Sequence, residues 1–532
     1  MDTQILTSIL LAIFFTVMIA IGLYCRRSAT DVNGFVLGGR SVGPWLTAFA
    51  YGTSYFSAVI FVGYAGQFGW NFGVASTWIG LGNAFLGSLL AWAVLGRRTR
   101  IMTQSLGSKT MPDFFWKRYS SSKLRIAAAL IVFVFLIPYT ASLYNGLSSL
   151  FNIAFDIPYY VIIAIMAVLT GVYVLFGGYM ATAINDFIQG LIMLVGIIAV
   201  VCAVINSQGG FTEAMVKLSE FFVTTPSGTE FSGAFTSFLG PDPVFLFFVV
   251  VLTSLGTWGL PQMVGKFYAI KDEASIRKGT IISTVFAVIV AGGCYFLGGF
   301  GRLFIAPEDL HGYDSIIPTM LSTLSPIVIA IVIVLVLSAS MSTLSSLVLT
   351  SASTLTLDLV MAKDKKEGSD EKKKLLIMRI FIAFFIILSA AIAVLKDSIW
   401  AENVFIAQMM GVSWGALAGA FLAPFLYGLY WKKTTTPAVA ASFIFGVGLE
   451  VFQLIVSVLA AGGNDVLAGL PVLSFVFKNS LYSGVFAMVG GLIIVPIVSL
   501  LTQKKRPSNV EEIFSCYQKV VTTDITDSLG AE

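Results

Sequence analysis

Charge is scarce in this 532-residue chain, since only 11% of the residues are charged and 57% are hydrophobic. A soluble domain of this length needs a more polar surface, whereas a protein whose outer face meets lipid does not. The four cysteines show no CxxC spacing, so they indicate neither a disulfide framework nor a metal site. The only histidine, His311, lies in a polar loop. It therefore argues against a histidine-based metal site or catalytic triad.

What the chain does contain is a series of apolar runs long enough to cross a bilayer. Thirteen are predicted, near 5–25, 44–70, 73–97, 123–152, 157–177, 182–205, 243–264, 280–303, 325–358, 376–396, 400–430, 436–460 and 481–502. This pattern predicts an all-α polytopic membrane protein with 13 transmembrane helices. Residues 1–502 form a single transmembrane domain, and residues 503–532 form a polar cytoplasmic tail. No nucleophile, acid and base cluster in the spans, so an enzyme is not expected.

The basic residues test this membrane topology, because Lys and Arg are enriched in cytoplasmic loops. All but four of the 32 basic residues fall on one side, the exceptions being Lys217, Arg302, Lys396 and Lys478. Arg26 and Arg27 follow the first span, and no small-residue cleavage site accompanies them, so this span is a retained helix rather than a signal peptide. The prediction is a multi-pass plasma-membrane protein with its N-terminus outside and its C-terminus in the cytoplasm.

One predicted span, VLSASMSTLSSLVLTSAST (Val336–Thr354), is rich in hydroxyl side chains and free of charge. A single serine in a membrane helix more often bonds to its own turn than to a ligand. Titratable carboxylates, which a proton-driven carrier needs in its core, are almost absent from the spans, with Asp186 and Glu450 as the exceptions. The balance favours a cation bound by neutral oxygens, and sodium is a hard ion that suits such ligands.

Partners for these hydroxyls require backbone carbonyls freed by a broken helix. Gly52 precedes a polar stretch in the second span, and Gly256, Gly259 and Pro261 interrupt the seventh. Either interruption alone is better explained as a kink, since proline frees a carbonyl one turn earlier. Five helices apart, the pair indicates an inverted-repeat transporter, with repeats over about 44–205 and 243–430.

Three motifs carry a resemblance to a known family: FVLGGRSVGPW (Phe35–Trp45), VLFGGYMATAINDFIQG (Val174–Gly190) and SASMSTLSS (Ser338–Ser346). They resemble the sodium:solute symporter family in one register from about residue 5 to 500. The resemblance implies a LeuT-type five-plus-five inverted repeat with one extra N-terminal and two extra C-terminal helices. Sodium would be a co-transported ion, and no organic cofactor is expected.

The resemblance also implies the ion site. Sodium would be bound by the backbone carbonyls of Thr53, Phe56 and Ala339 and by the hydroxyls of Ser342 and Thr343. Asp186 matches a family aspartate near the route of inward ion release, and the alternative is that it caps the sixth helix. Glu450 matches no family residue, and we interpret it as a polar side chain that is packed in the protein or remote from the pore.

The solute is expected to be a small carboxylate, such as a proline-like amino acid or pantothenate, because the sequence looks closest to that branch. Two departures are Tyr55, where that branch has an aspartate, and Thr253 and Thr257, where it has aromatics. The alternatives are a sugar or sialic acid, or a sensor that keeps a transporter fold. The expected partners are solute, sodium and lipid, with no nucleic acid and no obligatory protein. The predicted solute contacts are Ser54, Tyr55, Ser57, Tyr139, Thr257, Trp258 and Gln262.

Overall fold

The computed structural model describes residues 3–155, 158–224, 230–310, 312–362, 371–399, 406–464 and 466–518. His311, the start of the helix predicted over 400–430 and residues 519–532 of the predicted tail lie outside them. The described chain is mostly helical. The longest helices are α1 (Thr3–Cys25), α8 (Ser122–Phe155), α9 (Tyr159–Ser207), α13 (Glu273–Gly298), α15 (Pro326–Thr354), α16 (Glu371–Ile399), α17 (Ile406–Tyr430), α18 (Thr436–Ala461) and α20 (Ser480–Leu501).

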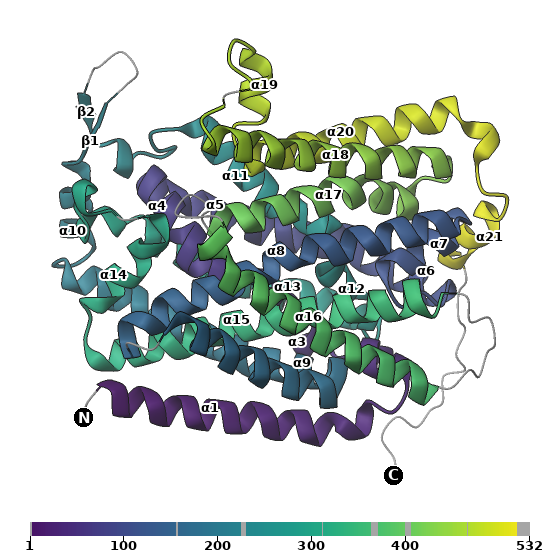
Figure 1. Cartoon of the computed structure of the whole chain (residues 1–532), viewed down its shortest axis with the longest axis horizontal. Coiled ribbons are helices and arrows are strands. Elements are labelled where there is room, and N and C mark those ends of the chain that lie inside the picture. Colours follow the sequence, from purple (N-terminus) through teal and green to yellow (C-terminus); the bar gives the residue numbers. More distant parts are fainter. Residues whose placement is uncertain are drawn as a thin grey trace.

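Shorter elements complete or connect the long helices. They are α2 (Val32–Leu37), α3 (Pro44–Tyr55), α4 (Ala65–Phe72), α5 (Thr77–Gly82), α6 (Arg97–Ser105), α7 (Met111–Tyr119), α10 (Phe211–Ser219), β1 (Phe222–Thr224), β2 (Glu230–Ser232), α11 (Pro243–Leu255), α12 (Pro261–Ala269), α14 (Ile316–Ser322), α19 (Pro471–Val476) and α21 (Val510–Phe514). The two strands form an antiparallel hairpin. It lies with α10 at one end of the helix bundle, and α6, α7 and α21 lie at the other (Figure 1).

Ten helical segments among the described residues are long and apolar enough to cross a membrane, or 11 if the bent pair α11 and α12 counts as one span. Two of them, Val59–Ser105 and Tyr160–Ser207, contain 47 and 48 residues. A bilayer needs only about 20 residues per helix, so each of these segments is long enough to cross twice. The predicted helical, multi-span class is therefore confirmed, whereas the number of 13 spans stays a prediction.

The hydroxyl-rich helix α15 lies in the middle of the bundle. It packs against α1, α3, α8, α9 and α16, and every side chain from Leu335 to Leu349 is buried. Its hydroxyl groups therefore face protein rather than lipid. Many of them bond to the preceding turn, as Ser338 does to the Val334 carbonyl at 2.7 Å, and this self-satisfaction makes polar residues tolerable inside a membrane helix.

Both predicted helix breaks are present. Helix α3 ends at Tyr55, and Phe56 adopts an extended conformation before the chain resumes through a π-helical turn into α4. Helix α11 gives way to a 3₁₀ turn at Gly256, Leu260 is extended, and Pro261 opens α12 after a bend of 49°. Proline suits the first turn of α12 because that position needs no backbone donor.

The far ends of the two broken helices are joined to each other. The Val42 amide, just before α3, donates to the Ala269 carbonyl at 3.2 Å, and the Lys271 amide donates to the Val42 carbonyl at 3.0 Å. The guanidinium of Arg40 donates to the Tyr268 and Ser108 carbonyls. The start of α3 and the end of α12 are therefore anchored in one cluster, which fixes how the two breaks face each other.

A kink at Gly178 divides α9. This glycine has φ 54° and ψ −148°, and a Cβ there would lie 2.7 Å from the Phe35 carbonyl oxygen. The kink separates the two helices predicted over 157–177 and 182–205. Asp186 lies well inside the second half of α9 and not at its N-terminus. The capping alternative for Asp186 is therefore wrong.

The first part of the predicted polar tail packs onto the protein. Val510, Ile513 and Phe514 are buried, and the Arg118 guanidinium lies 5.0 Å from the centre of the Phe514 ring. The Lys432 ammonium lies 2.6 Å from a carboxylate oxygen of Glu511. Three apolar residues at i, i+3 and i+4 are too few to stand out in a polar stretch, so the sequence pattern did not reveal this docking.

We expect Gly446→Ala to destabilise the protein. A Cβ at Gly446 in α18 would lie 2.4 Å from the Gly419 carbonyl carbon of α17, and backbone atoms cannot move aside as a flexible side chain can. Overpacking of this kind costs about 1–3 kcal/mol. Gly448→Ala on the same helix is the control, because a Cβ there meets nothing within 4 Å. Thermal melting of the two purified variants checks this, and equal melting temperatures would contradict it.

Candidate functional site

The broken end of α3 meets α15 through two hydroxyl groups. The hydroxyls of Ser342 and Thr343 each lie 3.1 Å from the Thr53 carbonyl oxygen. They also lie 3.2 and 3.1 Å from the Ala339 carbonyl oxygen. The last carbonyls of a helix lack partners within it, and α3 ends two residues after Thr53, so this oxygen is available to α15.

These four oxygens form one buried cluster. The side chains of Thr53, Ser342 and Thr343 are completely inaccessible to solvent. Each hydroxyl donates to a carbonyl here, yet it keeps lone pairs that can turn toward a cation. Phe56, the fifth predicted contributor, is the extended residue immediately after α3. Hard oxygen donors without net charge are ligands that a small alkali cation accepts, so the cluster can hold one.

A buried ion pair lies beside this cluster. Asp186 of α9 is fully buried, and one of its carboxylate oxygens is 3.6 Å from the Lys266 ammonium of α12. The ammonium donates to the Ser346 hydroxyl at 2.9 Å, and that hydroxyl lies 2.7 Å from the Ser54 hydroxyl. Ser54 thus joins the α3 break to the ion pair rather than to an open solute space.

A second cluster gathers around the Tyr139 hydroxyl on α8. The Ser57 hydroxyl and the Trp414 indole N–H lie next to it, and the Tyr139 and Trp414 rings meet edge to face with centroids 6.0 Å apart. All three polar atoms are buried, and within the described residues none of them has a hydrogen-bond partner outside this group. Buried donors whose neighbours are only one another offer a place for an acceptor that the protein itself does not supply.

Three other predicted solute contacts make hydrogen bonds to carbonyl groups of the protein itself. The Tyr55 ring stacks on Phe56 with centroids 4.4 Å apart and lies 6.0 Å from Trp414, while its hydroxyl donates to the Thr253 carbonyl. The Thr257 hydroxyl donates to the Ser254 carbonyl at 2.9 Å, and the Trp258 indole N–H donates to the Leu86 carbonyl at 3.1 Å. Thr257 and Trp258 therefore hold the break between α11 and α12 in place.

Comparison with known proteins decides the family. A model of the sodium:solute symporter family matches residues 35–446 of this chain. The chain belongs to the sodium:solute symporter family. The symporter is 30% identical over 462 residues to sodium/proline symporter 2 of Staphylococcus saprophyticus, covering 84% of this chain and 86% of the relative. It is 28% identical to a sodium/proline symporter of Staphylococcus aureus, covering 94% of each chain.

The symporter also shares its fold with a solved structure. That structure is a Na⁺-coupled sialic acid symporter in a substrate-bound, outward-open state, with a TM-score of 0.73 and 17% sequence identity. The alignment covers 93% of this chain and 97% of that one. At this identity the likeness concerns the fold alone, which is the LeuT-type fold that the family resemblance implies. The family and these relatives are transporters.

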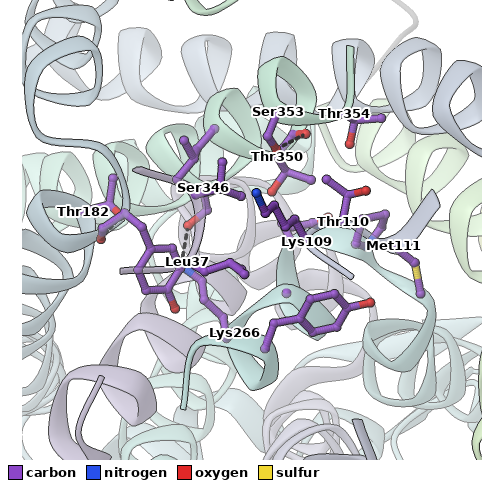
Figure 2. A pocket seen from close by; sticks show the side chains of 17 residues that line it. Leu37, Lys109, Thr110, Met111, Thr182, Lys266, Ser346, Thr350, Ser353 and Thr354 are labelled. Carbon is purple, nitrogen blue, oxygen red and sulfur yellow. Dashed lines mark hydrogen bonds between the residues drawn. The ribbon is translucent and has the colours of Figure 1, made fainter. Parts of the chain in front are cut away.

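A pocket approaches the ion pair of the symporter from the end that carries α7. It extends from Lys109 and Thr110 to Lys266, Ser346 and Gln262, and Figure 2 shows Lys266 pointing toward Ser346. About 50 Å³ of it can be occupied by water, and one water needs on the order of 10–15 Å³ of such space. The pocket therefore has room for a few waters, and Gln262 faces this route rather than Tyr139.

Sequence reasoning missed two residues of these sites in the symporter. The seventh span is predicted to end near residue 264, which puts Lys266 in the following loop, whereas the bent pair continues to Ala269. A lysine one turn before the end of an apolar stretch carries no signal of its own. Trp414 was overlooked because a tryptophan among small apolar residues is typical of packing, and only its nearness to Tyr139 sets it apart.

Proposed function

We propose that this symporter couples sodium entry to the uptake of a small carboxylate, with proline as the first candidate. The observation that carries the proposal is the convergence of the Thr53 and Ala339 carbonyls with the Ser342 and Thr343 hydroxyls. Such a cluster bridges α3 and α15, and an ion in it stabilises one arrangement of the two helices. The similarity to sodium/proline symporters supports the choice of solute.

We propose that the solute carboxylate binds at the cluster around the Tyr139 hydroxyl. The Ser57 and Tyr139 hydroxyls and the Trp414 N–H are donors with no partner outside their own group, and a carboxylate is an acceptor with two oxygens. The aromatic faces of Tyr55 and Trp414 lie close enough to cover the apolar part of a small ring. Ser57 follows Thr53 by four residues, on the other side of the break, so solute and ion would share the same stretch of backbone.

The membrane threading is part of the same proposal. We infer 13 spans, with α3–α9 and α11–α17 as the two inverted repeats and the N-terminus outside. The pocket lined by Lys109 then opens to the cytoplasm. Rocking of the two repeats about the broken helices would open the site to each side in turn. An inward-moving sodium ion gains about 2.3 kcal/mol per 100 mV of membrane potential, which drives accumulation.

The test is uptake of radiolabelled proline into proteoliposomes. We expect accumulation with an inward sodium gradient and almost none when potassium replaces external sodium. Competition by unlabelled pantothenate, sialic acid and glucose ranks the other solute classes. Undiminished uptake without sodium would reject the coupling, and failure of proline to compete with a better solute would reject proline while leaving the coupling intact.

A further inference from the structure

Another group of oxygens that could bind a cation, from Asp186, Ser346 and Ser54, lies one helical turn from the proposed sodium site. Ser346 follows Ser342 and Thr343 by one turn on α15, and residues at this spacing share a helix face. The Asp186 carboxylate and the Ser346 hydroxyl both approach the Lys266 ammonium, and the Ser54 hydroxyl lies 2.7 Å from that of Ser346. A carboxylate with two hydroxyls is an ordinary ligand set for a hard cation, and here it carries a negative charge that the first cluster lacks.

This second position already contains a cation. The Lys266 ammonium donates to Ser346 at 2.9 Å, lies 3.6 Å from Asp186 and sits 5.4 Å from the centre of the Tyr179 ring. Only 4% of the Lys266 side chain is exposed. Among the described residues, neither Asp186 oxygen accepts a hydrogen bond, so the nearby ammonium is the group that neutralises this buried carboxylate.

We infer that Lys266 is a tethered cation that excludes a second sodium ion from the Asp186–Ser346–Ser54 position. The symporter would then bind one sodium ion per solute, at the neutral cluster alone. A second ion, together with the Lys266 ammonium, would place two positive charges beside a single buried carboxylate, and like charges at this separation in a poorly solvated site repel. This inference rests on the proposed sodium-coupled function and deepens it by setting the number of ions.

The position of Lys266 also explains why the exclusion is effective. Water in the pocket can reach the ammonium from the Lys109 side, so sodium from that side meets Lys266 before it meets Asp186. The lysine is attached to α12, next to the anchored cluster at Tyr268 and Ala269. A covalently held cation has a high local concentration, and dissolved sodium competes poorly with it.

The experiment counts bound sodium ions on purified protein. We expect the wild type to bind about one ²²Na⁺ per chain and Lys266→Met to bind about two, because the Asp186 carboxylate then lacks its counter-charge and takes an ion from solution. Asp186→Asn combined with Lys266→Met should return to one, since the charged ligand is gone. Lys271→Met, which removes the same charge from an exposed position two residues after α12, should stay at one.

A second readout covers the case in which Lys266→Met folds poorly. The unpaired carboxylate should make its stability depend on sodium, so its melting temperature should rise more steeply with sodium than that of the wild type or the double variant. One bound ion in Lys266→Met, with a melting response like that of the wild type, would overturn the inference. Absence of any sodium binding in the wild type would instead reject the proposed function.

Discussion

Thr343→Val raises the external sodium concentration that gives half-maximal uptake by about tenfold to a hundredfold. Valine matches threonine in shape but lacks the hydroxyl, so the α3–α15 contact keeps its packing and loses one oxygen ligand. Losing a hydrogen-bonding group toward a charged partner costs about 1.5–3 kcal/mol, and each 1.4 kcal/mol is about tenfold in affinity. The maximal uptake rate at saturating sodium should change much less than the sodium requirement.

Ser342→Ala should act in the same direction, because its hydroxyl reaches the same two carbonyls as that of Thr343. Thr343→Ser keeps the hydroxyl and should stay close to the wild type. The matched control is Ser340→Ala, two residues before Ser342 on α15, whose hydroxyl bonds to the Val336 carbonyl of its own helix at 2.9 Å. Sodium-dependent uptake curves for the four variants decide the matter. Equal sodium requirements for Thr343→Val and Ser340→Ala would remove α15 from the ion site.

The backbone part of the ion cluster could be predicted from the sequence because its causes are local. Proline at 261 and glycine at 256 and 259 interrupt a helix wherever they occur, and both breaks are found where expected. The hydroxyl run of α15 excludes a lipid-facing helix and so predicts a buried one. The approach of Thr53 to Ser342 and Thr343 required the family resemblance as well, since nothing local joins residues so distant in sequence.

The side-chain environment of the site could not be predicted in this way. Whether Lys266 ends a helix in solvent or reaches into the core depends on the bend of α11 and α12 and on the anchoring of α12 to the start of α3. Both are tertiary features. The same holds for Thr257 and Trp258, which were chosen as solute contacts for their position at the break. Their polar atoms instead satisfy carbonyls of the neighbouring helix at Leu86 and Gly87.

Removing one donor from the cluster around the Tyr139 hydroxyl should weaken solute binding and leave sodium binding almost unchanged. In Tyr139→Phe the ring and its edge-to-face contact with Trp414 remain, and only the unpaired hydroxyl is lost. A hydrogen bond to a carboxylate is worth about 1.5–3 kcal/mol, so the solute concentration for half-maximal uptake should rise about tenfold to a hundredfold. The stability of the empty protein should fall little, because the Tyr139 hydroxyl has no hydrogen-bond partner outside its own cluster.

Trp414→Phe extends this prediction to the indole N–H. It should also raise the solute concentration for half-maximal uptake. In the double variant with Tyr139→Phe, the loss of binding free energy should be less than the sum of the two single losses, because both donors bind one carboxylate. Tyr427→Phe is the control on the same helix, since its hydroxyl donates to the Leu492 carbonyl at 3.0 Å, away from the cluster. Solute titrations at saturating sodium measure all four proteins. If Tyr139→Phe and Trp414→Phe both keep the solute affinity of Tyr427→Phe, the carboxylate binds elsewhere, and the unpaired donors then need another acceptor.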